Sequence, residues 1–246
     1  MAFQTVFKRY ELKYLLTYEQ KERLLAAMDP YMKPDAYGRT TIRNLYFDTD
    51  SYLLIRRSIE KPKYKEKLRV RSYGVAEEGD TVFVELKKKY KNVVYKRRLS
   101  LPYGKAMDWL SGKEKSDGTQ IAREIDYFLQ FYENLHPTVF LSYERQAYYA
   151  ADDSDFRVTF DEKVLCRQKE LSLSSEAGGI PLLPEGKVLM EIKCRGGIPL
   201  WMTKVLSEER IYKTSFSKYG TAYKTVIFPQ THKINAYNML EVENHA

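Results

Sequence analysis

The segment KEKLRVRSYG, residues 65–74, places cations at alternate positions. If this segment is a strand, Lys67, Arg69 and Arg71 point to one face, and the leucine and valine between them point to the other. A guanidinium group can hold two phosphate oxygens at once, so such a face could bind a phosphate chain. The pattern also fits the solvated outer face of an ordinary half-buried strand.

The same alternation recurs in most segments that read as strands. One face is apolar, and the other carries Lys or Arg, often with a carboxylate two positions away, as in Glu85 and Lys87. Outer faces usually mix Ser, Thr and Gln with their charges, whereas these faces are rich in arginine. The faces carry Arg9, Glu11, Lys13, Glu85, Lys87, Lys96, Arg98, Arg145, Arg157, Asp161, Glu191 and Lys193.

Two arrangements of the strands explain these faces. In a sandwich, the charged faces are solvated and have no chemical role. In a closed barrel, the apolar faces pack outward against helices and the charged faces point into the lumen. Many cations in one lumen repel one another unless carboxylates offset them or a polyanion is bound. The barrel arrangement therefore predicts a ligand with several phosphate groups.

The composition indicates a globular protein with an anionic partner. The 246 residues include 41 Lys and Arg against 33 Asp and Glu, a net charge of +8. This excess fits nucleic acid, an anionic membrane or a phosphate-rich small molecule, without choosing among them. Cys166 and Cys194 lack metal-ligand spacing and the three histidines are scattered, so neither a His-based zinc site nor a His-centred triad is expected. No segment reads as a signal peptide or a membrane span, and we expect a cytoplasmic protein.

Periodicity and turn signals predict an α+β fold with a mainly antiparallel sheet. Thr17 can cap the first helix, with Gln20 reaching back to complete a capping box. Strands are expected at 7–16, 40–49, 65–74, 81–90, 92–101, 137–150, 156–167 and 187–196. Helices are expected at 17–28, 50–60, 103–112, 119–135 and 199–210, and near the end of 214–228.

Nine short motifs occur in an order and spacing that resemble the VTC domain. They are RYELKY, IRNLYFDT, EKLRVRSYG, VELKKK, YKRRL, SYERQAY, FRVTFD, MEIK and SFSKYG. The VTC domain is the polyphosphate polymerase domain of the vacuolar transporter chaperone family, which belongs to the triphosphate tunnel metalloenzymes. The resemblance covers about residues 3–228, and we treat 1–246 as one domain. It implies an eight-stranded antiparallel β-barrel with flanking helices, whose lumen binds triphosphate or polyphosphate.

The resemblance also implies roles for individual residues. The residues matched to catalytic positions are Lys13, Arg69, Arg71, Lys87, Lys96, Arg145, Arg157 and Lys218. Those matched to substrate binding are Arg9, Lys67, Arg98, Lys193, Ser217 and Arg57. Glu191 matches the metal-ligating glutamate, with Glu11 and Glu85 as helpers, and the metal would be Mn²⁺ or Mg²⁺.

The sequence departs from the family pattern at two positions. Arg9 stands where many tunnel enzymes have the first glutamate of an ExExK signature, as basic residues do in the VTC branch. Ser58 stands where the VTC pattern has an arginine, and Arg56 or Arg57 would have to replace it. The second departure is the best support for the alternative to an enzyme, a binding module without chemistry.

The resemblance therefore implies metal-dependent phosphoryl transfer from ATP to a growing polyphosphate chain. The same lining residues would serve a triphosphate or polyphosphate hydrolase, or a module that only binds polyphosphate. A nucleic-acid binder is a further alternative because KKKYKNVVYKRR could form a basic stripe. Against it, carboxylates recur on the cationic faces and would repel a nucleic-acid backbone, so no nucleic-acid partner is expected. Members of the VTC family work beside membrane subunits, which implies a membrane-protein partner and a place at the inner face of a membrane.

Overall fold

The computed structural model describes residues 10–230 except 92, 153 and 154. The strands are β1 (Tyr10–Thr17), β2 (Met32–Pro34), β3 (Thr40–Asp48), β4 (Tyr64–Tyr73), β5 (Thr81–Tyr90), β6 (Val93–Pro102), β7 (His136–Ala150), β8 (Arg157–Arg167), β9 (Ile180–Pro181), β10 (Lys187–Cys194) and β11 (Lys213–Thr214). The helices are α1 (Tyr18–Met28), α2 (Leu53–Ile59), α3 (Tyr103–Leu110), α4 (Gln120–Tyr132), α5 (Leu200–Glu208) and α6 (Lys218–Ala222), and α6 continues into the π-helix η1 (Tyr223–Ile227).

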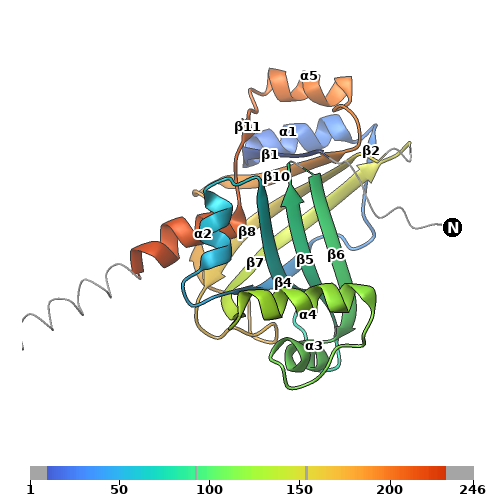
Figure 1. Ribbon diagram of the computed structural model, residues 1–246. Helices are drawn as coiled ribbons and strands as arrows, with labels where there is room; N and C mark the ends of the chain where they lie inside the picture. The colour runs from blue at the N-terminus through green and yellow to red at the C-terminus, as the bar shows by residue number, and fades with distance from the viewer. Residues whose placement is uncertain (1–9, 92, 153–154, 231–246) are drawn as a thin grey trace, which may run out of the picture.

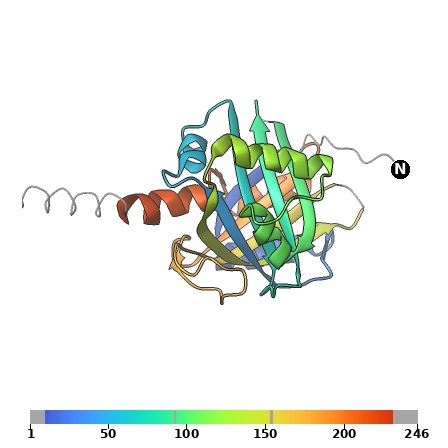
Figure 2. The same cartoon turned by 60° about the horizontal axis from the view of Figure 1, so that its bottom comes forward.

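One antiparallel sheet connects all of these strands (Figure 1). Its order is β11-β1-β10-β8-β7-β3-β4-β5-β6, with β2 pairing β7 and β9 pairing β8. The predicted α+β class and the antiparallel sheet are confirmed. Figure 2 shows that the sheet curls, so that β4, β5 and β6 lie in front of β1 and β10.

The predicted eight-stranded closed barrel is wrong in two respects. The sheet has 11 strands, because β2, β9 and β11 of two or three residues each add to the eight long strands. Strands this short carry too few residues to show a period of two, so the sequence does not reveal them. The sheet is also not closed, since β6 pairs only with β5 within the described residues and its other edge joins no strand.

Two of the apolar clusters lie between the outer face of the sheet and the helices. In the first, Leu68 and Val70 of β4 pack with Trp109 of α3 and with Ile125 and Phe128 of α4. α4 runs across β4, β5 and β6 in Figure 1. The alternation in β4 therefore places its apolar residues under a helix, and its cations face the other way.

The second cluster lies beneath α1 and α5, which are stacked on the side of the sheet formed by β1 and β10 (Figure 1). Leu16, Met190 and Ile192 of the sheet contact Leu24 of α1 and Met202 of α5 within this cluster. The predicted capping box at the start of α1 is confirmed. The Thr17 hydroxyl accepts from the backbone of Gln20, and the Gln20 side chain accepts from the backbone of Thr17.

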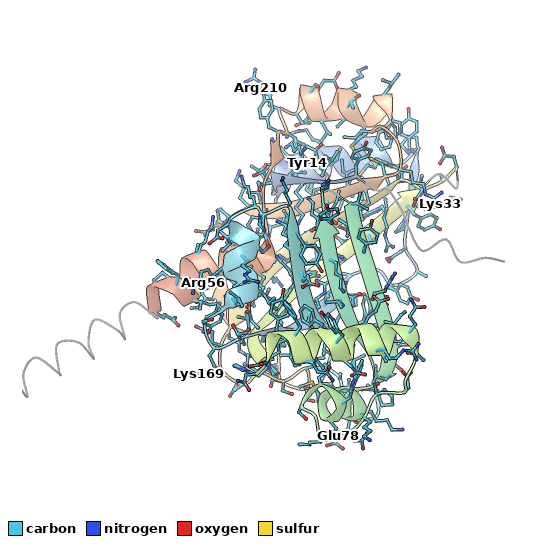
Figure 3. The ribbon with its side chains drawn as sticks, viewed as in Figure 1. Tyr14, Lys33, Arg56, Glu78, Lys169 and Arg210 are labelled. Atoms are coloured by element: carbon cyan, nitrogen blue, oxygen red, sulfur yellow. The ribbon has the colours of Figure 1, made fainter. Side chains whose placement is uncertain are left out.

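A third cluster joins α2 and α6–η1 to β3 and β7, and includes Ile55, Leu141 and Tyr219. Buried Asp48 at the end of β3 accepts hydrogen bonds from the backbone N–H groups of Leu54 and Ile55, and from the hydroxyl of Tyr219. This one carboxylate therefore caps α2 and fixes α6. Arg56 projects from the exposed side of α2, on the outside of the molecule (Figure 3). Among the described helices, none is both long and apolar enough to cross a membrane.

Candidate functional site

The inner face of the curled sheet carries a set of charged side chains that we call the charge cluster. Its cations come from β1, β4, β5, β6, β7, β10 and α6. They are Lys13, Lys67, Arg69, Arg71, Lys87, Lys96, Arg98, Arg145, Lys193 and Lys218. Its carboxylates are Glu11, Glu85, Asp161 and Glu191. With ten cations against four carboxylates, the described cluster carries an excess of positive charge.

Asp161 is the most deeply buried carboxylate of the cluster, with a side chain that is 0% exposed. Its strand places it directly opposite Arg145, whose guanidinium donates to both carboxylate oxygens, at 2.6 and 2.7 Å. The ammonium of Lys218 also donates to Asp161. Burial alone would raise the pKa of Asp161, but Lys218 and Arg145 hold it below its ordinary value.

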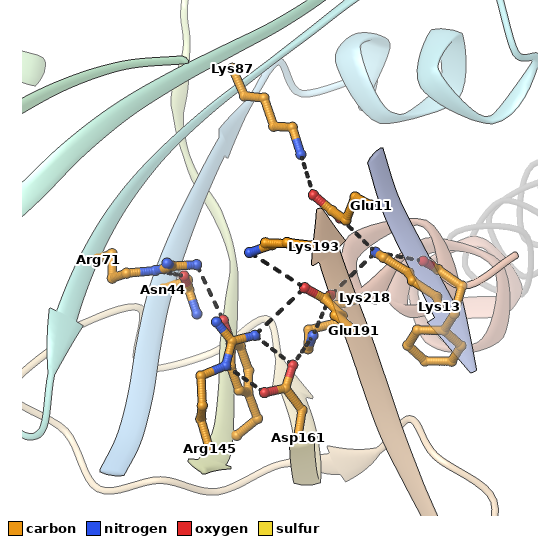
Figure 4. Close-up of polar contacts among 12 residues, drawn as sticks. Glu11, Lys13, Asn44, Arg71, Lys87, Arg145, Asp161, Glu191, Lys193 and Lys218 are labelled. Atoms are coloured by element: carbon orange, nitrogen blue, oxygen red, sulfur yellow. Dashed lines mark hydrogen bonds and ion pairs between the residues drawn. The ribbon is translucent and has the colours of Figure 1, made fainter. Parts of the chain in front are cut away.

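Glu191 lies beside this group on β10 and is surrounded by four cations (Figure 4). Its oxygens lie 3.4 Å from the Lys13 ammonium and 3.5 Å from the Lys218 ammonium. Arg145 and Lys193 follow at 3.8 and 3.9 Å. Although burial opposes ionisation, these cations hold the pKa of Glu191 well below its ordinary value. Glu191 is therefore an anion at neutral pH.

Glu11 connects two distant parts of the sheet. Its carboxylate lies 3.5 Å from the ammonium of Lys13 on its own strand, and 3.5 Å from that of Lys87 on β5. Burial raises the pKa of Glu11, but Lys87 is the strongest of the cations that lower it, to about 2. Figure 4 shows Lys87 reaching across to Glu11. The predicted pairing of acids with lysines thus occurs between strands as well as along them.

Glu85 is the centre of a second group, and its side chain is 1% exposed. Arg69 and Arg98 each donate to it, from Nε at 2.7 and 2.8 Å. The Lys96 ammonium lies 2.6 Å away and Arg71 lies 3.9 Å away. Burial lowers the pKa of Lys96 to about 8 even though Glu85 opposes that shift. Glu85 therefore offsets four of the phosphate-binding cations that the sequence predicts.

Neutral partners that sequence reasoning missed hold the two arginines of β4. The hydroxyl of Tyr46 accepts from Arg69 at 2.9 Å. Arg71 donates to the side-chain oxygen of Asn44 at 2.9 Å and to the hydroxyl of Tyr143 at 3.2 Å. The alternation in IRNLYFD could have indicated them, because Asn44 and Tyr46 lie two positions apart on β3 and therefore point to the same face of the sheet. The register places each directly opposite its arginine.

The segment before α6 closes one side of the cluster. The Lys67 ammonium donates to the Ser217 hydroxyl at 3.3 Å, and Lys13 donates to the backbone oxygen of Phe216 at 2.9 Å. The Ser217 hydroxyl also accepts from the backbone N–H of Gly220 and so caps α6. This cap directs Lys218 toward Asp161 and Glu191. The SK pair near the end of the chain therefore belongs to the cluster.

Two of the predicted site residues lie apart from the charge cluster, and a third falls outside the part of the chain that the structure describes. Arg157 lies at the start of β8, where its side chain is 53% exposed and its guanidinium is 3.4 Å from Asp35. Arg57 is exposed on α2 and acts electrostatically on Tyr132 of α4, on the outer side of the sheet. Arg9 lies outside the described residues.

The three predicted metal-binding glutamates do not converge on one point. No group of three or more His, Cys, Asp or Glu side chains in the described part of the chain could hold a metal ion. The carboxylate oxygens of Glu85 are already occupied by its contacts with four cations and are therefore not free to bind a metal ion. Glu11 and Glu191 form a closer pair, because both lie within 3.5 Å of the Lys13 ammonium. Two carboxylates fit a Mg²⁺ or Mn²⁺ ion that obtains its remaining ligands from substrate phosphates and water, but not an all-protein site.

Comparisons with known proteins show the fold and the family of this chain. Three solved structures have similar folds. They are a candidate adenylate cyclase from Bacillus halodurans (16% identity, TM-score 0.55, covering 87% of this chain and 96% of that one), a candidate adenylyl cyclase from Hippeastrum (15%, 0.52, 87% and 94%) and a candidate adenylate cyclase from Vibrio parahaemolyticus (10%, 0.51, 89% and 98%). No curated protein sequence matches the chain. The model of the VTC domain family matches residues 8–227, and the chain therefore belongs to the VTC domain family.

Proposed function

We propose that the protein binds a nucleoside triphosphate on its inner face and transfers the terminal phosphoryl group to a growing inorganic polyphosphate chain. The observation that carries this proposal is the charge cluster, in which ten cations meet only four carboxylates. Such an excess is unfavourable without a ligand and favourable around a chain of phosphates. Membership of the VTC domain family supports the same substrate class.

The transfer needs positioning and charge neutralisation more than acid–base catalysis. An oxygen of the acceptor phosphate attacks the terminal phosphorus of the nucleotide. The bond from that phosphorus to its bridging oxygen breaks, and the nucleoside diphosphate leaves with the electron pair. Fixed cations on several sides stabilise the charge on the oxygens around the phosphorus. Arg69 and Arg145 are suited to this role because their partners already hold the guanidinium planes in place.

The family implies a divalent cation, and Glu191 and Glu11 would hold it together with the bound phosphates. When bound, Mn²⁺ or Mg²⁺ would neutralise phosphate charge and orient the chain for in-line transfer. Lys13 occupies the space between the two carboxylates, so its ammonium has to turn toward the phosphates. Lys193 and Lys218 beside Glu191 remain available for the same phosphates.

Hydrolysis is a second candidate because the same residues would serve it with water as acceptor. The Hippeastrum protein, whose fold is similar, is described as having a dominant triphosphatase activity.

Pure binding is a third candidate. Ser58, which stands in place of the expected arginine, is buried on α2, and its backbone oxygen accepts from Lys65 at 3.2 Å.

The contacts of the basic stripe argue against a nucleic-acid site. Lys87 and Lys96 point to the inner face, where they contact Glu11 and Glu85. Arg97 points to the opposite face and contacts Glu124 of α4 at 2.9 Å. The described residues of the stripe are therefore divided between the two sides of the sheet, and they do not form one continuous surface for a duplex or a single strand.

One experiment separates these candidates. The pure protein is incubated with ATP and Mn²⁺, and nucleoside diphosphate, free phosphate and long polyphosphate are measured separately. Transfer yields ADP and long polyphosphate, hydrolysis yields ADP and free phosphate, and a binding module yields neither. In Glu191→Gln the amide keeps the shape but not the charge, so metal-dependent turnover should be lost while the circular dichroism spectrum is kept. Full activity in this variant would exclude Glu191 as a metal ligand.

A further inference from the structure

Lys67 differs from the other cations of the charge cluster in its partners. Each of the other nine lies within 4.0 Å of a carboxylate. Lys67 forms no such ion pair within the part of the chain that the structure describes. Its ammonium donates to the Ser217 hydroxyl at 3.3 Å, and lies 6.0 Å from the centre of the Tyr219 ring. A neutral hydroxyl and an aromatic face leave its charge without a counter-ion.

The charged groups that act most strongly on Lys67 are cations. Lys65 and Arg69 flank it on β4, and Lys87 lies directly opposite on β5. Lys13 faces it from β1. The segment before α6 contributes only the Ser217 hydroxyl, and α6 itself the ring of Tyr219. The site is therefore arranged for an anion that the described part of the chain does not supply.

This environment disfavours the charged form of the amine. Burial is the main cause and repulsion from Lys87, Lys65, Lys13 and Arg69 adds to it, so that the pKa of Lys67 falls to about 7. At neutral pH the side chain is therefore close to half protonated. A phosphate anion that arrives beside it reverses the repulsion and favours the ammonium form.

We propose that Lys67 couples the binding of a phosphate chain to the uptake of a proton, so that affinity for triphosphate depends on pH around neutrality. This inference rests on the ligand class of the proposed function and adds its regulation. Above pH 7 the empty site must first take up a proton at Lys67. This required proton uptake lowers the affinity for triphosphate by up to about tenfold for each pH unit above 7. The decrease stops at the pKa that Lys67 has when triphosphate is bound.

The test is isothermal titration of the metal-free protein with inorganic triphosphate at pH 7.5, in buffers of different ionisation enthalpy. The dependence of the observed heat on the buffer gives the number of protons taken up. Triphosphate itself exchanges protons with the buffer, so the informative quantity is the difference between parent and variant. Lys67→Arg keeps the positive charge but cannot titrate in this range. Lys88→Arg is the matched control, because Lys88 lies on the outer face beside Glu66.

We expect uptake in the parent to exceed that in Lys67→Arg by roughly three quarters of a proton, the fraction of Lys67 that is deprotonated half a pH unit above its pKa. Lys88→Arg should behave as the parent does. Affinity in Lys67→Arg should also vary less between pH 7 and 9. Equal proton uptake in parent and Lys67→Arg, with triphosphate bound, overturns the inference and leaves the proposed function intact. Absence of triphosphate binding in the parent, both without metal and with Mn²⁺, overturns both.

Discussion

Lys87 and Glu11 form an ion pair at 3.5 Å, although their strands lie near opposite ends of the sheet order. β5 is the last strand but one at one end, and β1 is the second strand from the other. Only a strongly curled sheet brings these positions together. The ion pair therefore shows that the inner face of the sheet wraps around the charge cluster (Figure 4). The contact spans the open side of the sheet, where no backbone hydrogen bonds join the described strands.

This ion pair should contribute little to stability. The side chains of Lys87 and Glu11 are 42% and 33% exposed, and exposed pairs are weak because water screens them. A double-mutant cycle with Lys87→Met and Glu11→Gln should give a coupling energy below about 1 kcal/mol by urea denaturation. A coupling of several kcal/mol would mean that the pair holds the sheet in its curled form.

The pair of Asp161 with Arg145, by contrast, should contribute strongly to the stability of the fold. Asp161 is buried and neutralises both Arg145 and Lys218, so Asp161→Asn leaves two cations without it. The variant should lose about 3–5 kcal/mol of unfolding free energy. Excess triphosphate should restore much of that loss, because it supplies the missing negative charge.

The control for this prediction is Asp108→Asn, which removes an exposed carboxylate that pairs with Lys113 at 3.3 Å. Denaturant melts with and without triphosphate compare the two variants. Equal and small losses in both would show that Asp161 does not balance the charge of its neighbours.

Arg69→Ala and Arg71→Ala should each weaken triphosphate binding about tenfold to hundredfold, because each removes a charge-assisted contact to phosphate. The sequence alone predicts that the unliganded variants keep or gain stability, since a repelling charge is lost. The contacts of Arg69 with Glu85 and Tyr46 reverse that expectation, and a moderate loss is expected instead.

Leu68→Ala and Val70→Ala are the matched controls on the same strand. Both side chains are fully buried against the outer helices, so these variants should lose stability through packing and keep their affinity for triphosphate. Titration calorimetry and thermal melts on the four variants distinguish the two faces. Arginine variants that bind triphosphate as the parent does would remove β4 from the binding site.

The sequence predicts which residues carry charge on each strand, because a period of two is a local property. It does not predict which of them meet. Glu85 and Asp161 become centres of ion-pair networks only through the register of neighbouring strands, which places Arg98 opposite Glu85 and Arg145 opposite Asp161. The alternation of residues places Asp161 on a charged face but indicates no role for it, since the role depends on α6 bringing Lys218 to it.

Whether the sheet closes into a barrel also cannot be predicted from the local pattern of residues. Alternation is the same in an open curled sheet and in a closed barrel, because both bury one face and line the other. The difference lies in whether the edge of β6 finds a partner, which depends on tertiary geometry. The short strands β2, β9 and β11 are also set by their partners and not by their own two or three residues.

Acid pH offers a direct test of the charge on Glu11. Its pKa lies near 2 in the folded protein against 4.5 in the unfolded reference, so the unfolded chain binds the proton first as pH falls. The contribution of Glu11 to stability is therefore complete above pH 4.5, and is lost as pH falls toward 2. Glu11→Gln lacks this contribution at every pH. The melting temperature of the parent should exceed that of Glu11→Gln at pH 6, and the difference should shrink steadily below pH 4.5.

Glu208→Gln serves as the comparison for this titration, because Glu208 is an exposed carboxylate outside the charge cluster, 3.9 Å from Lys204 on the same helix. Its melting temperature should follow that of the parent at each pH. The experiment is run without triphosphate, since a bound polyanion would compete with Glu11 for Lys87 and Lys13. A difference between parent and Glu11→Gln that stays constant from pH 6 to pH 3 would show that the carboxylate acts through its shape and not through its charge.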